Sequence, residues 1–112
     1  MRSKLRTAGD AAVLQLSGQI VIGNGDAALT DAVNRILDRG AQRRIVIDLS
    51  RVSYMDSSGL GALVACRRTA AAREVPLVLL RPAGKVNDLL QLTGLSELFR
   101  VFEDEGEALA RE

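Results

Sequence analysis

Apolar residues recur with two different periods along the chain, and the two periods alternate. Runs typical of strands lie at residues 2–7, 13–22, 44–49, 76–80 and 98–102. Segments with helical spacing lie at residues 26–39, 57–73, 84–93 and 104–111. The first two strands adjoin through Gly9 and Asp10, which predicts an antiparallel hairpin, whereas strands joined by helices usually lie parallel. We therefore predict a small α/β fold: a mostly parallel sheet with an N-terminal antiparallel hairpin and helices packed against it.

The expected helices carry apolar residues on one face. The first begins with Asp26, a favourable N-cap, and ends before Gly40, a residue that favours helix termination. The predicted buried faces comprise Leu29, Val33, Ile36 and Leu37, then Leu60, Leu63, Val64 and Ala71, then Val86, Leu89, Leu90 and Thr93. Apolar helix faces of this kind pack against a sheet, so we expect these residues to form the part of the core that the helices contribute.

The length and the charge balance limit the class of protein. A chain of 112 residues with 47% apolar and 26% charged residues is expected to form a single domain, residues 1–112. Its 15 basic and 14 acidic residues leave a net charge of +1, so we expect no nucleic-acid partner. No apolar run approaches the roughly 20 residues that span a bilayer. The start of the chain lacks the pattern of a signal peptide, so we expect a cytoplasmic location without membrane insertion.

Histidine is absent, and Cys66 is the single cysteine. A Ser-His-Asp or Cys-His arrangement needs an imidazole, and zinc sites need clustered cysteine and histidine. We therefore predict no catalytic residue, no metal site and no enzymatic activity. Cys66 lies among small apolar residues, which predicts a core or boundary thiol.

Residues 23–28 resemble the glycine-rich turn of a dinucleotide-binding fold. Gly23, Gly25 and Ala28 follow the G-x-G-x-x-A spacing, and Asp48 stands about where such folds place their ribose-binding acid. Asp26, however, places a carboxylate where the pyrophosphate would lie, and the chain has no room for a second nucleotide-binding half. We expect a tight turn between strand and helix here, and no cofactor.

The densest signal is the sequence SRVSYMDSSGLGALV at residues 50–64, where a strand is expected to pass through a short loop into a helix. Asp56, Ser57 and Ser58 are all favourable N-cap types, whereas Gly59 and Gly61 weaken the first turn. Small residues there would let a partner approach the serine hydroxyls, and a helix N-terminus stabilises a phosphate. The alternative is that Asp56 or Ser57 only caps the helix while the glycines ease packing.

Residues 45–64, IVIDLSRVSYMDSSGLGALV, resemble the signature of the STAS family (sulfate transporter and anti-sigma factor antagonist domains), in particular bacterial anti-sigma factor antagonists. Weaker similarity surrounds this core, at residues 16–18, 77–80 and 92–98. Members of the family commonly have an acidic residue shortly after the early glycine, in a Gly-x-Leu/Ile-Asp pattern. This chain reads Gly18, Gln19, Ile20, Val21 and reaches its next acid at Asp26, which leaves the surroundings of the turn and the identity of a kinase open.

The resemblance implies a non-enzymatic switch in transcription regulation by partner switching. Family members bind an anti-sigma factor that is also a serine kinase of histidine-kinase-like ATPase fold, and so release a sigma factor. The kinase phosphorylates the first serine of the turn, which is Ser57 in this chain, and a serine phosphatase would reverse the step. The residues expected to bind the partner are Asp56, Ser57, Ser58, Gly59, Leu60 and Gly61. The alternative is a constitutive STAS-type interaction subunit of a soluble or membrane transport complex, without phosphorylation.

Overall fold

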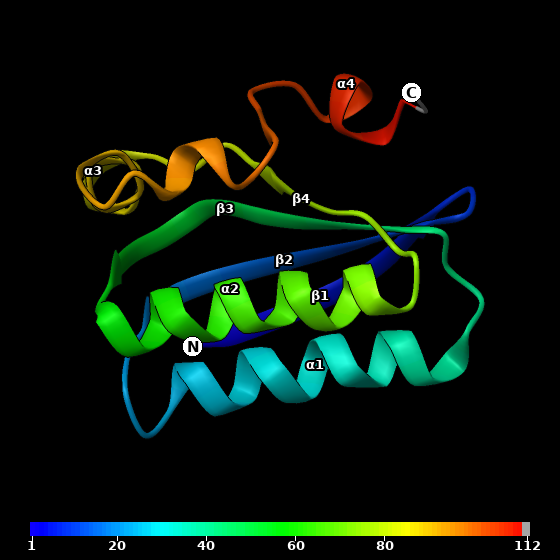
Figure 1. The fold of residues 1–112 in the computed structure, drawn as a ribbon, viewed down its shortest axis with the longest axis horizontal. Coiled ribbons are helices and arrows are strands. Elements are labelled where there is room, and N and C mark those ends of the chain that lie inside the picture. Colours follow the sequence, from blue (N-terminus) through cyan, green and yellow to red (C-terminus); the bar gives the residue numbers. More distant parts are fainter. Residues whose placement is uncertain (111–112) are drawn as a thin grey trace.

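The computed structural model describes residues 1–110, and its strands form one five-stranded sheet in the order β1-β2-β3-β4-β5 (Figure 1). The strands are β1 (Arg2–Ala8), β2 (Ala11–Ile20), β3 (Arg44–Met55), β4 (Leu77–Leu80) and β5 (Val101–Phe102). β1 pairs antiparallel with β2, whereas the β2–β3, β3–β4 and β4–β5 pairs are parallel. The predicted mixed sheet with an N-terminal hairpin is confirmed.

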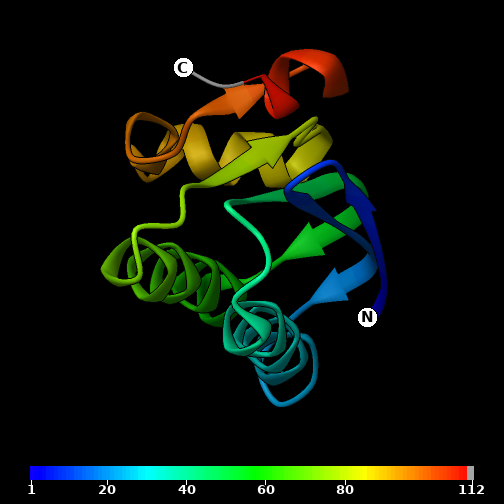
Figure 2. The ribbon, with the colours of Figure 1, turned by 90° about the vertical axis from the view of Figure 1, so that its right-hand side faces the viewer.

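The helices cover the two faces of this sheet unequally (Figures 1 and 2). They are α1 (Gly25–Arg39), α2 (Ser57–Ala72), α3 (Gly84–Leu92) and the short α4 (Glu105–Leu109), with a 3-10 turn, η1 (Leu95–Glu97), after α3. The larger core joins side chains of α1, α2 and α3 to alternate sheet residues such as Ile45 and Ile47. The smaller core joins Val46 and Val78 to Ala108 of α4. Among residues 1–110, α4 is thus the helix packed on the second sheet face, and it covers only part of that face.

The predicted apolar faces of the helices are mostly confirmed. All four expected residues of α1 are buried, and Leu60, Leu63, Val86 and Leu90 are buried as well. Ala71 is exposed, however, and Ala70 takes its place in the core. Thr93 is also exposed because it follows the last turn of α3, where its hydroxyl donates a hydrogen bond to the carbonyl oxygen of Leu89 at 2.8 Å.

Asp26 does not cap α1, contrary to the prediction. The helix starts at Gly25, with Asn24 at the N-cap position, and the Asp26 carboxylate accepts a hydrogen bond from the N–H of Ala27 instead. Gly25 is required by close packing, because a Cβ atom there would lie 2.7 Å from the Cα atom of Ile20. The glycine pattern at residues 23–28 thus lets α1 begin directly against β2.

The last strand is shorter than predicted. Only Val101 and Phe102 pair with β4, whereas Leu98 and Phe99 lie in the turn that follows η1. Gly94, the N-cap of η1, has the left-handed conformation, with φ of 75°. Phe99 is buried in the larger core, so this apolar residue anchors a turn to the core and is not part of a strand.

Cys66 lies inside the larger core, as predicted. Burial raises the pKa of its thiol to about 11, so almost none of it is thiolate at neutral pH. This agrees with a packing role, because the nucleophilic form of cysteine is the thiolate.

Candidate functional site

The candidate site is carried by the end of β3, which runs to Met55 rather than to Leu49 as predicted. The polar residues that suggested a loop continue the ladder with β2 up to the pair Ile20–Met55. Two irregularities in the register each place one extra residue on β3. The Ser53 hydroxyl also donates a hydrogen bond to the carbonyl oxygen of Gly18 at 3.3 Å. As a result, the turn into α2 lies beside the loop that joins β2 to α1 (Figure 1).

Asp56 holds these two segments together. It is the N-cap of α2, and its Oδ1 accepts a hydrogen bond from the N–H of Gly59 at 2.8 Å. Its Oδ2 accepts a second bond from the N–H of Ile22, in the β2–α1 loop, at 3.0 Å. The bonds from Gly59 and Ile22 hold the pKa of the Asp56 carboxyl below its ordinary value, because they stabilise the charged form. Asp56, and not Ser57, is therefore the residue that caps α2.

Replacing Asp56 with asparagine should lower the melting temperature at neutral pH, because an amide can accept from only one of the two N–H groups. A lowered folded-state pKa contributes stability above the unfolded-state pKa, and this stability is lost as pH falls through the folded value. The difference between wild type and Asp56→Asn should therefore shrink below about pH 4 in thermal melts. Asp88→Asn, at an exposed position of α3, is the control. Equal melting temperatures of wild type and Asp56→Asn at pH 7 would contradict the role of the carboxylate.

The two glycines of the first turn of α2 differ in their surroundings. A Cβ atom on Gly59 would lie 2.1 Å from the carbonyl oxygen of Ile20, so Gly59 is required where α2 crosses the end of β2. A Cβ atom on Gly61 would have no neighbour within 4 Å, and this residue is exposed. Close approach by a partner is thus available at Gly61, whereas Gly59 serves the packing of the domain itself.

The six residues expected to bind the partner do not form one continuous exposed surface. Ser57 and Gly61 are exposed, Asp56 and Ser58 are half-buried, and Gly59 and Leu60 are buried. The two buried residues shape the turn, and only the other four are accessible at its surface.

Ser57 and Ser58 have different neighbours. Ser57 is the first residue of α2 and is exposed. Ser58 lines a groove between α1 and α2, and Asp26 and Asp31 are also among the residues that line it. This acidic groove was not evident from the sequence, because it forms only when α1 and α2 lie side by side (Figure 1). A phosphate on Ser58 would meet two carboxylates there, whereas Ser57 does not line the groove.

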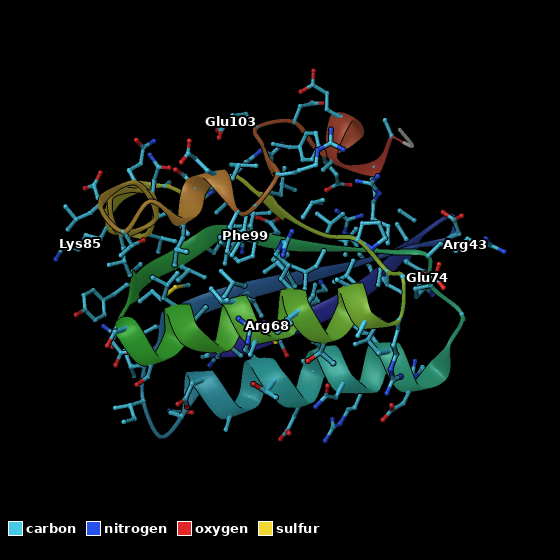
Figure 3. The ribbon with its side chains drawn as sticks, viewed as in Figure 1. Arg43, Arg68, Glu74, Lys85, Phe99 and Glu103 are labelled. Atoms are coloured by element: carbon cyan, nitrogen blue, oxygen red, sulfur yellow. The ribbon has the colours of Figure 1, made fainter. Side chains whose placement is uncertain are left out.

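Two exposed apolar side chains belong to the segments that meet at Asp56, the β2–α1 loop and the end of β3. Ile22, whose N–H binds Asp56, is 70% exposed, and Tyr54, two residues before Asp56, is 41% exposed. Lys85 lies over the Tyr54 ring, with its Nζ 5.9 Å from the ring centre, and Figure 3 shows Lys85 at the end of the molecule where α2 begins. Neither apolar residue was predicted to be part of the site. The sequence signal that could have indicated Ile22 is its position directly before Gly23. The structure places Ile22 beyond the last paired residue of β2.

Within residues 1–110, no three histidine, cysteine, aspartate or glutamate side chains come together in a group that could hold a metal ion. No helix in this part of the chain is both long enough and apolar enough to cross a membrane.

Comparisons with known proteins agree with this geometry. The family model for the STAS domain matches residues 2–108. The anti-sigma-B factor antagonist of Listeria monocytogenes is 41% identical over 61 residues, which are 54% of each chain, so the chain spans about half the length of the curated relatives it matches. A candidate anti-sigma factor antagonist from Thermotoga maritima shares the fold with a TM-score of 0.86 and 24% identity, over 96% of this chain and 91% of that one. Bacillus SpoIIAA in its phosphorylated form has a TM-score of 0.71 and 22% identity, over 95% and 96% of the two chains. Because the family model covers nearly the whole chain, the chain belongs to the STAS domain family.

Proposed function

We propose that this STAS domain is an anti-sigma factor antagonist whose binding to an anti-sigma factor is switched off by phosphorylation of Ser57. The observation that carries the proposal is the place of Ser57: it is the exposed first residue of α2 in the family's Asp-Ser-Ser-Gly turn. The curated relatives named anti-sigma-B factor antagonists, and the existence of a phosphorylated form of SpoIIAA, support it.

The electrostatics of the turn support a switch of this kind. Phosphorylation would add a charge of about −1.5 to −2 at pH 7. The positive end of the α2 dipole favours an anion at its first residue. The neighbouring charges are nevertheless acidic, since Asp56 precedes Ser57 and Asp26 lines the groove beside Ser58. The phosphate would therefore make an already acidic region strongly anionic next to the exposed apolar side chains of Ile22 and Tyr54.

Binding would then depend on apolar and small-residue contacts in the unmodified protein. Ile22, Tyr54 and Gly61 are exposed in the segments next to Asp56 and offer such contacts. A partner that fits this surface would lose them when a hydrated dianion lies between, because burying an unpaired charge is costly. The role is non-enzymatic, and it takes place in the cytoplasm. The partner is a serine kinase of histidine-kinase-like ATPase fold. A serine phosphatase removes the phosphate and so restores binding.

Incubation with the purified anti-sigma kinase and ATP should place one phosphate on Ser57, as located by peptide mass spectrometry. We expect no phosphate on Ser58, because Ser58 lines the acidic groove with Asp26 and Asp31. Ser57→Ala should abolish the incorporation, and Ser58→Ala is the matched control that should retain it. Phosphate found solely on Ser53 or Thr69 would refute the assignment. A partner that binds the chain but transfers no phosphate to it in the presence of ATP would favour the constitutive interaction subunit.

A further inference from the structure

β1 leaves one edge of the sheet unpaired. It is the first strand in the sheet order, and residues 2–7 are all exposed (Figure 2). An edge strand of seven residues presents a row of free backbone N–H and C=O groups to solvent. Such a row can pair with an extended segment of another chain.

The open face of the sheet beside this edge is basic. Arg2, Lys4 and Arg6 alternate along β1, and so they lie on one face. Arg51 joins them through the register, because Arg2 is opposite Ser17 and Ser17 is opposite Arg51. Arg2, Lys4 and Arg51 line a shallow groove of about 310 Å³. None of these three side chains has an ion-pair partner among the described residues.

The other face of the same edge carries an apolar groove with a basic rim. This groove of about 210 Å³ lies between β1 and α1, and Leu5, Leu14 and Ile36 line it together with Arg35 and Arg39. Leu5 is 42% exposed, so its apolar side chain is accessible to an added strand. An added strand would therefore meet arginine or lysine on both faces and an apolar contact on one.

We propose that the β1 edge is a second docking surface, which binds an extended acidic segment of a partner protein as an additional strand. Side chains of that segment would alternate between carboxylates over Arg2 and Lys4 and apolar residues against Leu5. A carboxylate already contacts this basic face within the molecule, because Glu105 of α4 forms an ion pair with Arg6. This surface shares no residue with the turn at residues 56–61, so it does not depend on the proposed switch.

A second copy of this chain fits the edge less well than an acidic segment does. Two antiparallel β1 strands centred on Lys4 would place Arg2 of each copy opposite Arg6 of the other and the two Lys4 side chains opposite each other. Like charges directly opposite destabilise a strand pair. The same charges favour a segment with aspartate or glutamate at alternate positions.

The test is a titration of the full chain with a fluorescent peptide of about nine residues that alternates glutamate and valine, at low ionic strength. Fluorescence anisotropy should show saturable binding, and the backbone amide signals of residues 2–7 should shift in NMR spectra. The double variant Arg2→Glu and Lys4→Glu should weaken binding by about tenfold or more, since two cross-strand charge pairs change sign. Arg68→Glu, at an exposed position of α2 (Figure 3), should leave binding unchanged.

Two further peptides separate strand addition from general attraction of charge. A lysine-valine peptide should bind the double variant better than the wild type, which also shows that the variant is folded. The glutamate-valine peptide N-methylated at alternate residues keeps its charge but cannot complete the ladder, and it should bind at least about tenfold more weakly. Equal binding of the methylated peptide, or no binding of the unmethylated one at millimolar concentration, would overturn the proposal.

Discussion

Gly59→Ala should destabilise the domain by about 3 kcal/mol or more. The new Cβ atom would lie 2.1 Å from the carbonyl oxygen of Ile20, and the obstacle is backbone rather than a side chain that can rotate away. Overpacking of this kind costs about 1–3 kcal/mol and at times more. The clash could be relieved only if α2 moved away from β2. That movement would also disturb the hydrogen bonds that the Asp56 carboxylate accepts from Gly59 and Ile22. Thermal melts should show a decrease of roughly 10 °C or more for a chain of this size.

Gly61→Ala is the matched control, two residues further along the same helix. A Cβ atom there would meet nothing within 4 Å, and alanine loses less conformational freedom than glycine on helix formation. This variant should gain about 0.5–1 kcal/mol of stability. If Gly59→Ala melted at the wild-type temperature, the close approach of α2 to β2 would be wrong.

The order of the strands and helices was predictable because the apolar periods in this chain are unambiguous. The buried run at residues 45–49 is apolar except at Asp48, as expected for a central strand with one face in the larger core and Val46 in the smaller core. The Asp-Ser-Ser-Gly turn was predictable too, since its residue types are those that begin helices. In both cases the signal lies in residues that are close together in the sequence, and the structure shows the expected element at those residues.

The features that escaped prediction depend on contacts between distant segments. Polar residues 50–54 resembled a loop, yet they extend β3 because β2 supplies a partner strand up to Ile20. The sequence leaves open whether Gly59 admits a partner or eases packing, and only the carbonyl of Ile20 reveals its packing role. The acidic groove beside Ser58 likewise requires α1 and α2 to lie together. No window of sequence around the turn contains that information.

Ser57→Asp should weaken binding to the anti-sigma factor by at least about tenfold, or 1.4 kcal/mol, whereas Ser57→Ala should bind like the wild type. Neither change should unfold the domain. Asp56, and not Ser57, provides the side-chain cap of α2, so alanine at residue 57 removes an exposed hydroxyl without removing the cap. An aspartate in the first turn of a helix is favoured by the dipole by about 0.3–1 kcal/mol.

Equal melting temperatures of the two variants would assign any difference in binding to charge at the surface. The aspartate carries less charge than a phosphate and has a different shape, so a partial effect is the expected one. The acidic groove makes a further distinction possible, because Ser58→Asp adds the same charge beside Asp26 and Asp31. If the turn as a whole only repelled an acidic partner, the two aspartate variants would weaken binding alike. If the partner packs around the Ser57 hydroxyl, Ser57→Asp should weaken binding more than Ser58→Asp does. Equal affinities of wild type, Ser57→Ala and Ser57→Asp would contradict the switch and would leave the constitutive interaction subunit as the better description.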